Sequence, residues 1–306
     1  MQFSIYQESR RGARRFNQDR IAYCYNKDTL LMLVADGMGG HLRGEMAAQI
    51  AMQFITDAFR REAKPGLPDP ALFLSRSITG AHHAIVRRAA ERGLPEAPRT
   101  TCVACVVQDG AACWAHAGDS RLYHIRDGRI QAQTKDHSRV QQLIDQGRIR
   151  EEAVAAHPER NQIFNCLGSA RPPQVDSSGV VQLHSGDTLI LCSDGIWSPL
   201  SSKIISSAVL KSGIMQAVPE LLDEAERRAG RECDNLSVIA VTWEENFQAA
   251  RPDQAAARDT PPHSATPAPR EQGAADAQNG YLSDGEIERA IAEIRNEINK
   301  HPNGKT

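Results

Sequence analysis

Two apolar segments of the chain lead into the same pair of residues, an aspartate followed by a glycine. Residues 30–35 run directly into Asp36-Gly37, and residues 188–192 reach Asp194-Gly195 through one serine. Apolar runs without alternation indicate strands with both faces buried, because successive side chains in a strand point to opposite faces. Neither pair precedes a second strand-like run, so hairpin turns are not expected there. The sequence predicts two carboxylates at the exits of buried strands.

Hydrophobic periodicity predicts the other elements and the fold class. The expected strands span residues 21–25, 101–108, 111–117, 122–126, 175–183 and 236–243, and the expected helices span residues 44–62, 71–91, 140–145 and 218–228. Asp109-Gly110 and Asp127-Gly128 lie between strand-like runs and predict two-residue hairpin turns. Two long helices follow one another between strands, which excludes regular β-α alternation. We therefore expect an α+β fold with antiparallel sheets and helices in outer layers.

Composition narrows the class of protein. The 306 residues include 36 basic and 38 acidic ones, a net charge of −2, so the chain lacks the basic field that general nucleic-acid binding needs. Its longest purely apolar run, residues 30–35, is far shorter than the roughly 20 residues of a membrane-spanning helix. The seven cysteines are expected to be reduced and buried, and no secretory signal is recognised. We expect a cytoplasmic monomer that binds neither nucleic acid nor membrane.

The C-terminal part differs in composition from the rest. Residues 248–280 contain no Leu, Ile, Val, Met, Phe, Tyr or Trp, and are expected to form a disordered linker between a globular domain, residues 1–247, and residues 281–306. In that last segment Ile287, Ile291, Ile294 and Ile298 recur at heptad-like spacing and predict a short amphipathic helix. Residues 281–300 then form either a surface helix or a docking helix for a partner's groove or a short coiled coil.

Three more aspartates stand at the edges of expected strands. Asp19, Asp119 and Asp234 join Asp36 and Asp194 in this respect. If the five converge, they cannot all remain ionised without cations between them, because neighbouring like charges raise one another's pKa. Oxygen ligands without cysteine or regularly spaced histidine favour Mg²⁺ or Mn²⁺. The alternative is five unrelated turn aspartates.

The order of the motifs resembles a known family over roughly residues 5–243. The motifs are Arg14-x-x-Asn17-Gln18-Asp19, Asp36-Gly-Met-Gly-Gly-His41, Gly118-Asp119-Ser120-Arg121, Thr134-x-Asp136-His137-Ser138, Ser193-Asp194-Gly195 and Asp234-Asn235. Together they are similar to the metal-dependent protein phosphatases of the 2C type, particularly the bacterial branch. The resemblance implies a four-layer α-β-β-α sandwich, which agrees with the α+β expectation.

The resemblance also implies roles for individual residues. In the family, two divalent ions lie between the sheets and activate a water for attack on phosphorus. By resemblance Asp36 bridges both ions, the Gly37 carbonyl binds one of them, and the other ligands are Asp19, Asp194 and Asp234. Asp119 resembles the ligand of a third ion, shared with Asp194. Arg14 occupies the position of the guanidinium that binds the substrate phosphate.

Two residues depart from the family pattern. Met38 stands where many eukaryotic members have the histidine proposed as general acid, and either His41 or a metal-bound water is then the proton donor. Gln18 replaces an acidic residue and removes one water-mediated ligand, which predicts modest metal affinity. Residues 138–166 correspond to a region that includes the family's flap, where arginines can receive acidic or multiply phosphorylated segments; a solvated charged loop is the alternative.

The sequence predicts an enzyme that dephosphorylates phosphoserine and phosphothreonine in proteins and opposes a bacterial Ser/Thr kinase. Its expected partners are phosphorylated proteins, that cognate kinase, and a docking partner for residues 281–300. A phosphoprotein-binding pseudophosphatase on the same fold is one alternative. The other is a regulatory module in which the C-terminal tail is the functional part. The retention of Arg14 and the aspartates favours the enzyme.

Overall fold

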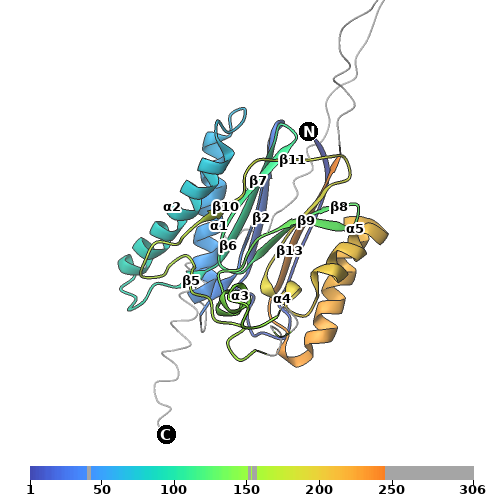
Figure 1. The fold of residues 1–306 in the computed structure, drawn as a ribbon. Helices are drawn as coiled ribbons and strands as arrows, with labels where there is room; N and C mark the ends of the chain where they lie inside the picture. Colours follow the sequence, from blue (N-terminus) through green and yellow to red (C-terminus); the bar gives the residue numbers. More distant parts are fainter. Residues whose placement is uncertain (40–42, 151–152, 154–156, 245–306) are drawn as a thin grey trace, which may run out of the picture. The chain divides into compact units, whose positions relative to one another are not determined.

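The fold comes from a computed structural model, which describes residues 1–39, 43–150, 153 and 157–244 (Figure 1). The predicted linker, residues 248–280, and the predicted C-terminal helix lie outside the described residues. The boundary at residue 247 lies there as well.

Two antiparallel sheets form the centre of the described structure. The first has the strand order β1-β13-β12-β8-β9, with bounds β1 Gln2–Arg10, β13 Leu236–Glu244, β12 Thr188–Cys192, β8 Arg121–Arg126 and β9 Arg129–Gln133. The second has the order β10-β7-β6-β3-β2, with bounds β10 Asp176–Ser177, β7 Ala111–Ala117, β6 Cys102–Gln108, β3 Thr29–Ala35 and β2 Arg20–Tyr25. Strand β11, Val181–Gln182, pairs with the far end of β7, and β4, Gly37–Met38, pairs with β5, Arg99–Thr100.

Helices cover the outer face of each sheet. Figure 1 shows α1, Arg43–Glu62, and α2, Pro70–Glu91, on one side of the sheets and α5, Ser202–Ala229, on the other. The short helices α3, Arg139–Asp145, and α4, Asp194–Trp197, and the 3-10 turn η2, Gly230–Glu232, complete the elements. Together the layers form the α-β-β-α sandwich that the sequence predicted.

Three apolar clusters separate the four layers, and strand β3 shows why its sequence does not alternate. Leu31 and Leu33 pack in the cluster beneath α1 and α2, whereas Leu30, Met32 and Val34 pack in the cluster between the sheets. Both faces of the strand are therefore buried, as the continuous apolar run indicated. Continuing the same alternation, Asp36 emerges toward the space between the sheets.

The expected elements are present, with some differences in extent. Residues 175–183 form two short strands, β10 and β11, instead of one. The helix expected over residues 218–228 is the second part of α5, which begins at Ser202 and is interrupted at Gly213, where φ is +67°. Strand β1 was not predicted, because its residues mix polar and apolar types without a clean pattern. Gly37, the second residue of the pair after β3, begins the two-residue strand β4, which pairs with β5 and forms no hairpin with β3.

The two predicted hairpin turns have the backbone geometry that the type I′ turn requires. Asp109 and Gly110 have φ of 53° and 72°, and Asp127 and Gly128 have φ of 49° and 70°. Positive φ at both central residues matches the right-handed twist of the flanking strands. These aspartates serve turn formation, unlike Asp36 and Asp194.

All seven cysteines lie in the described part of the chain, where six are buried and Cys24 is half-buried. All seven cysteines are free, and Cys102 and Cys105 lie in different apolar clusters on opposite faces of β6. Among the described helices, none is both long enough and apolar enough to cross a membrane.

Candidate active site

Asp36 is held at the end of β3 through its backbone. Its N–H donates to Thr101 Oγ1 at 3.0 Å, and its carbonyl accepts from the Thr101 N–H and the Thr100 hydroxyl, both at 2.8 Å. The next residue, Gly37, packs so closely on the start of α1 that an added Cβ would lie 2.3 Å from the Gly44 carbonyl oxygen. Only glycine fits there, so the Asp36-Gly37 backbone is fixed against α1.

Asp194 and Asp19 meet from opposite sheets. Asp194 opens helix α4 directly after β12, while Asp19 precedes β2. Ser193, the residue before Asp194, donates its hydroxyl to Asp19 Oδ2 at 2.7 Å. The hydroxyl oxygen of Ser193 in turn accepts from the Ser237 N–H at 3.0 Å. A buried serine therefore connects the two carboxylates, which the sequence placed 175 positions apart.

Asp119 lies in the turn between β7 and β8. The turn begins at Gly118, whose φ of +117° brings it so close to Thr101 that a Cβ would lie 2.6 Å from the threonine Cβ. Thr101 also shares a 2.7 Å hydrogen bond with the hydroxyl of Ser120. The same threonine thus holds both the Asp36 backbone and the turn that carries Asp119.

The aspartates raise one another's pKa. Loss of contact with water, followed by the charge of Asp234, raises the pKa of Asp19 to about 6, although the Ser193 hydroxyl opposes the shift. The same loss of water contact, with Asp234 and Asp19 nearby, raises the pKa of Asp194 to about 7. For Asp36 it raises the pKa well above its usual range, and the four other aspartates add to the shift. All five predicted carboxylates therefore act on one another across the two sheets.

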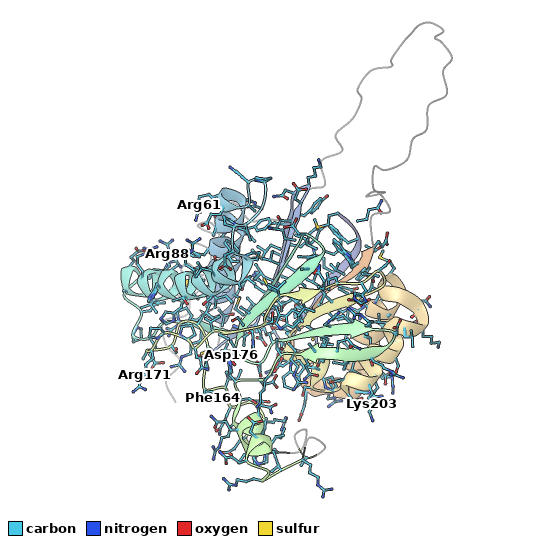
Figure 2. The ribbon with its side chains drawn as sticks, turned by 45° about the horizontal axis from the view of Figure 1, so that its top comes forward. Arg61, Arg88, Phe164, Arg171, Asp176 and Lys203 are labelled. Carbon is cyan, nitrogen blue, oxygen red and sulfur yellow. The ribbon has the colours of Figure 1, made fainter. Side chains whose placement is uncertain are left out.

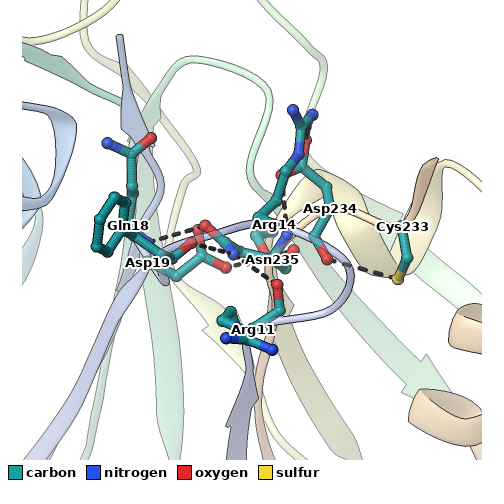
Figure 3. A network of polar contacts seen from close by, with 9 residues as sticks. Arg11, Arg14, Gln18, Asp19, Cys233, Asp234 and Asn235 are labelled. Atoms are coloured by element: carbon teal, nitrogen blue, oxygen red, sulfur yellow. Dashed lines mark hydrogen bonds and ion pairs between the residues drawn. The ribbon is translucent and has the colours of Figure 1, made fainter. Parts of the chain in front are cut away.

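Arg14 lies in the loop between β1 and β2 and forms a two-point ion pair with Asp234 (Figure 3). Its Nε donates to Asp234 Oδ1 at 2.8 Å and its Nη2 donates to Oδ2 at 2.7 Å. The arginine side chain remains 55% exposed. One edge of the guanidinium is occupied by the carboxylate, while the end of the side chain faces solvent.

Asn235 positions this loop, a function that the sequence motif alone did not reveal. Its buried side-chain amide donates to the carbonyl oxygens of Arg11 and Phe16 at 2.8 and 2.9 Å, and its Oδ1 accepts from the Gln18 N–H at 2.8 Å (Figure 3). The three bonds tie both ends of the Arg14 loop to the start of β13. Asparagine suits the position because it supplies both donors and an acceptor.

The carboxylate oxygens of the site are suitable ligands for divalent cations. Asp19 Oδ1 and Asp119 Oδ1 are buried and have no hydrogen-bond partner among the described residues. Buried carboxylate oxygens ordinarily have a donor or a cation beside them. Carboxylates without a matching number of basic groups are the ligands of hard cations such as Mg²⁺ and Mn²⁺. His41, the candidate proton donor, lies outside the described residues.

The fold and this grouping of residues agree with one protein family. The model of that family, "Protein phosphatase 2C", matches residues 6–229. This chain belongs to the protein phosphatase 2C family. Membership confirms the predicted family, the sandwich fold and the class of enzyme, a phosphatase that acts on phosphorylated proteins.

Individual relatives are similar at about one residue in three. A putative protein phosphatase 2C-type of Streptococcus pyogenes is 33% identical over 230 residues, covering 74% of this chain and 91% of the relative. The serine/threonine protein phosphatase PstP of Mycobacterium tuberculosis is 32% identical over 234 residues, 76% of this phosphatase but only 43% of PstP.

A solved structure is similar in fold. The crystal structure of the PstP catalytic domain in complex with two manganese ions is 28% identical, with a TM-score of 0.67 over 79% of this chain and 99% of the other. The family model ends at residue 229, so its match includes Asp19, Asp36, Asp119 and Asp194, whereas Asp234 follows it.

Proposed function

We propose that this phosphatase hydrolyses phosphoserine and phosphothreonine in proteins with two bound Mg²⁺ or Mn²⁺ ions. The observation that carries the proposal is the group of mutually repelling carboxylates between the sheets, two of which have buried oxygens without a hydrogen-bond partner among the described residues. A relative of the same fold, PstP, has a structure in complex with two manganese ions. When bound, such ions supply hydroxide at neutral pH and neutralise charge that develops on the phosphate.

The residues that would hold the ions are those at the strand ends. Asp36 would serve both ions, with the Gly37 carbonyl on one of them and Asp19, Asp194 and Asp234 on the other. Asp119 would hold a third ion together with Asp194. In support, the charge of Asp194 raises the pKa of Asp119, after the larger effect of burial.

Arg14 would bind the substrate phosphate while keeping its bond to Asp234. A guanidinium has two bidentate edges, and the Nε–Nη2 edge is the one that faces Asp234. The Nη1 end remains for two more N–H donors toward a phosphate oxygen. Asp234 thus orients the arginine, and lysine could not make both contacts.

Departure of the serine or threonine oxygen requires a proton. His41 is our candidate, since Met38 occupies the position of the eukaryotic histidine; a metal-bound water is the alternative. Replacement of His41 by Gln lowers kcat and removes the basic limb of its pH profile if the histidine is the donor. A pH profile identical to that of the wild type assigns the proton to water.

Substrates and partners follow from the family. Phosphorylated proteins are the substrate class, and a cognate Ser/Thr kinase would generate them in the cytoplasm, where we place this monomeric enzyme. The catalytic domain would span residues 1–247, with residues 248–280 as linker and residues 281–300 as docking helix. Deletion of residues 248–306 then leaves hydrolysis of a phosphopeptide unchanged and removes binding of the docking partner. A loss of hydrolysis would favour the tail as the functional part.

The decisive experiment is hydrolysis of a phosphothreonine peptide by the full chain with Mn²⁺ and with a chelator. We expect turnover only with metal, and a loss of at least about a hundredfold in Asp36→Asn, since removal even of outer-shell groups costs that much. Asp57→Asn is the matched control, because Asp57 is exposed on α1 and paired with Arg60. Binding of the phosphopeptide without turnover would instead make the chain a pseudophosphatase, and turnover in the chelator would contradict the metal mechanism.

Arg14→Lys tests the phosphate contact. We expect KM to rise about tenfold with a smaller change in kcat, because one bidentate bond to a charged group is lost. Arg15→Lys is the control, since the adjacent Arg15 is exposed and stacks on Phe16. Equal effects of the two substitutions would mean that Arg14 contributes only to the general charge of the loop.

A further inference from the structure

We propose that His137 is a positioning residue. Its single neutral imidazole holds two parts of the chain in place, the turn that carries Asp119 and the residues at which the flap segment returns. The flap segment is defined here as residues 139–150 and 157–162. The proposal rests on the proposed role of Asp119 for its effect on metal binding, but its structural part does not depend on that role.

On one side His137 is bonded to the Gly118–Asp119 turn. The Gly118 N–H donates to His137 Nδ1 at 3.2 Å, and the backbone N–H of His137 donates to the Gly118 carbonyl at 2.9 Å. These bonds enter the turn through the residue directly before Asp119. A shift of the imidazole is therefore transmitted to the carboxylate that would bind the third ion.

On the other side His137 is bonded to the residues at which the flap segment returns. The Phe164 N–H donates to the His137 carbonyl at 3.1 Å, and Asn165 Nδ2 donates to His137 Nδ1 at 2.6 Å. A bridge between Ser138 and Ile163 closes the base of the segment. The imidazole nitrogen Nδ1 is consequently the meeting point of two N–H groups from different parts of the chain.

The orientation of the Asn165 amide determines which imidazole nitrogen carries the proton. Asn165 Nδ2 also donates to the Gln174 carbonyl at 2.7 Å, and its Oδ1 accepts from the Gln174 N–H at 3.0 Å. This two-point contact with the Gln174 backbone excludes the flipped orientation of the amide. Flipping would place the amide nitrogen against the Gln174 N–H and the amide oxygen against the Gln174 carbonyl. Both groups at His137 Nδ1 are donors, so Nδ1 holds the lone pair and the proton is on Nε2.

The Nε2 nitrogen lies beside Asp176 but has no hydrogen-bond partner among the described residues. His137 Nε2 lies 3.2 Å from Asp176 Oδ2, and Figure 2 shows Asp176 close to Phe164 near the segment that carries α3. His116, which pairs with Asp176 across β7 and β10, stacks on His137 with ring centroids 4.7 Å apart and an angle of 12°. The stacked ring of His116 holds the imidazole in the plane in which Nδ1 meets its two donors.

The same three side chains have the composition of a metal site. One ligand atom each of His116, His137 and Asp176 lie within 4.8 Å of one another. Nevertheless, a metal on His137 Nε2 would need the proton to move to Nδ1, where it would face the N–H groups of Gly118 and Asn165. That conflict favours hydrogen bonding over metal binding at this cluster.

The tautomer is measurable in the wild-type protein. Imidazole ¹⁵N chemical shifts, recorded on the metal-free full chain at neutral pH, distinguish a protonated from an unprotonated ring nitrogen. We expect Nε2–H with Nδ1 unprotonated for His137. A proton on Nδ1 overturns the proposal, because the two N–H donors could then not both point at it.

Two substitutions separate the functions of the ring nitrogens. In His137→Asn, the side-chain oxygen replaces Nδ1 as an acceptor. In His137→Gln, the amide replaces Nε2, and the Gly118 and Asn165 donors are left unsatisfied. Tryptic cleavage of the metal-free chain at the exposed Arg148 and Arg150, located by mass spectrometry, reports opening of the flap segment. We expect cleavage about tenfold faster in His137→Gln, with His137→Asn close to wild type.

Controls and the metal measurement complete the test. His184→Gln and His184→Asn make the same changes at an exposed histidine and are expected to behave as wild type. In phosphopeptide hydrolysis, His137→Gln should raise the half-saturating Mn²⁺ concentration about tenfold, while His137→Asn should not. Equal behaviour of the two His137 variants in proteolysis would show that only ring packing matters and overturn the proposal.

The remaining outcomes separate this proposal from its rivals. A wild-type chain that shows no Mn²⁺-dependent turnover contradicts the proposed function, yet the ¹⁵N spectrum and the proteolysis still decide the role of His137. Calorimetry with Zn²⁺ should give the same number of sites in wild type and Asp176→Asn. Loss of one site in the variant would make the cluster a metal site and overturn the positioning role.

Discussion

The two ends of strand β12 carry aspartates in opposite electrostatic situations. Asp187 directly precedes the strand and is buried, so burial would raise its pKa, but hydrogen bonds from Arg126, the His184 N–H and His124 lower it to about 2. Asp194 follows the strand after Ser193, and its pKa is raised to about 7 by loss of water contact at its carboxyl group and by the charges of Asp234 and Asp19.

The difference separates a carboxylate that stabilises the fold from one that we propose as a metal ligand. Arg126 binds Asp187 through Nε and Nη2, both at 2.7 Å, and His124 Nε2 lies 2.9 Å from the same carboxylate. The charge of Asp187 is therefore balanced within the fold. Among the described residues, the basic group that lowers the pKa of Asp194 is Arg14, and its effect is smaller than those of burial, Asp234 and Asp19. That end of the sandwich is therefore the end suited to binding cations.

Removal of Asp187 should have the largest effect on stability. Asp187→Asn leaves the half-buried Arg126 and the buried His124 without their anion, and we expect the free energy of unfolding to fall by about 3 kcal/mol. Asp145→Asn is the control, because Asp145 pairs with Lys135 on the surface and should contribute little. Urea denaturation of the metal-free proteins measures both. A change in Asp187→Asn no larger than that of the control would remove the contrast between the two ends of β12.

Divalent metal should stabilise only the Asp194 end. With Mn²⁺ at about a hundred times its dissociation constant, linkage predicts about 2.7 kcal/mol of added stability for the wild type. Asp36→Asn should lose this gain, and in the chelator its Tm should exceed that of the wild type, since one of the repelling charges is gone. Thermal scans with and without Mn²⁺ test this, with Asp57→Asn as control. The idea fails if Asp36→Asn melts below the wild type in the chelator.

Acid should act on the Asp187 end and gives the smallest of the three effects. The pKa of Asp187 is lower in the folded chain than in the unfolded one, so its stabilising contribution is complete above about pH 4 and is lost as the pH falls toward about 2. Urea midpoints measured across that range should therefore fall more steeply for the wild type than for Asp187→Asn. Parallel slopes would place the acid sensitivity elsewhere in the fold.

Much of the Asp194 end of the sandwich was predictable because it depends on local sequence patterns. Asp36 and Asp194 follow apolar runs. Because side-chain direction alternates along a strand, each run predicts the face on which the next side chain emerges. The type I′ turns at Asp109 and Asp127 were predictable for the same reason, since their conformation depends on two adjacent residues. The short strands β10 and β11 and the first part of α5 were not, because their extent depends on packing against β7 and on the break at Gly213.

The sequence alone determined the order of the motifs, the strands that end in aspartate and the family to which they belong. Only the tertiary structure showed that Asp234 orients Arg14, that Asn235 ties down the Arg14 loop, and that His137 joins the Asp119 turn to the flap segment. Hydrogen-bond partners such as Asn165 and Gly118 lie far from one another along the chain or depend on backbone orientation. No local pattern encodes such partners, because they are selected by the packing of the two sheets.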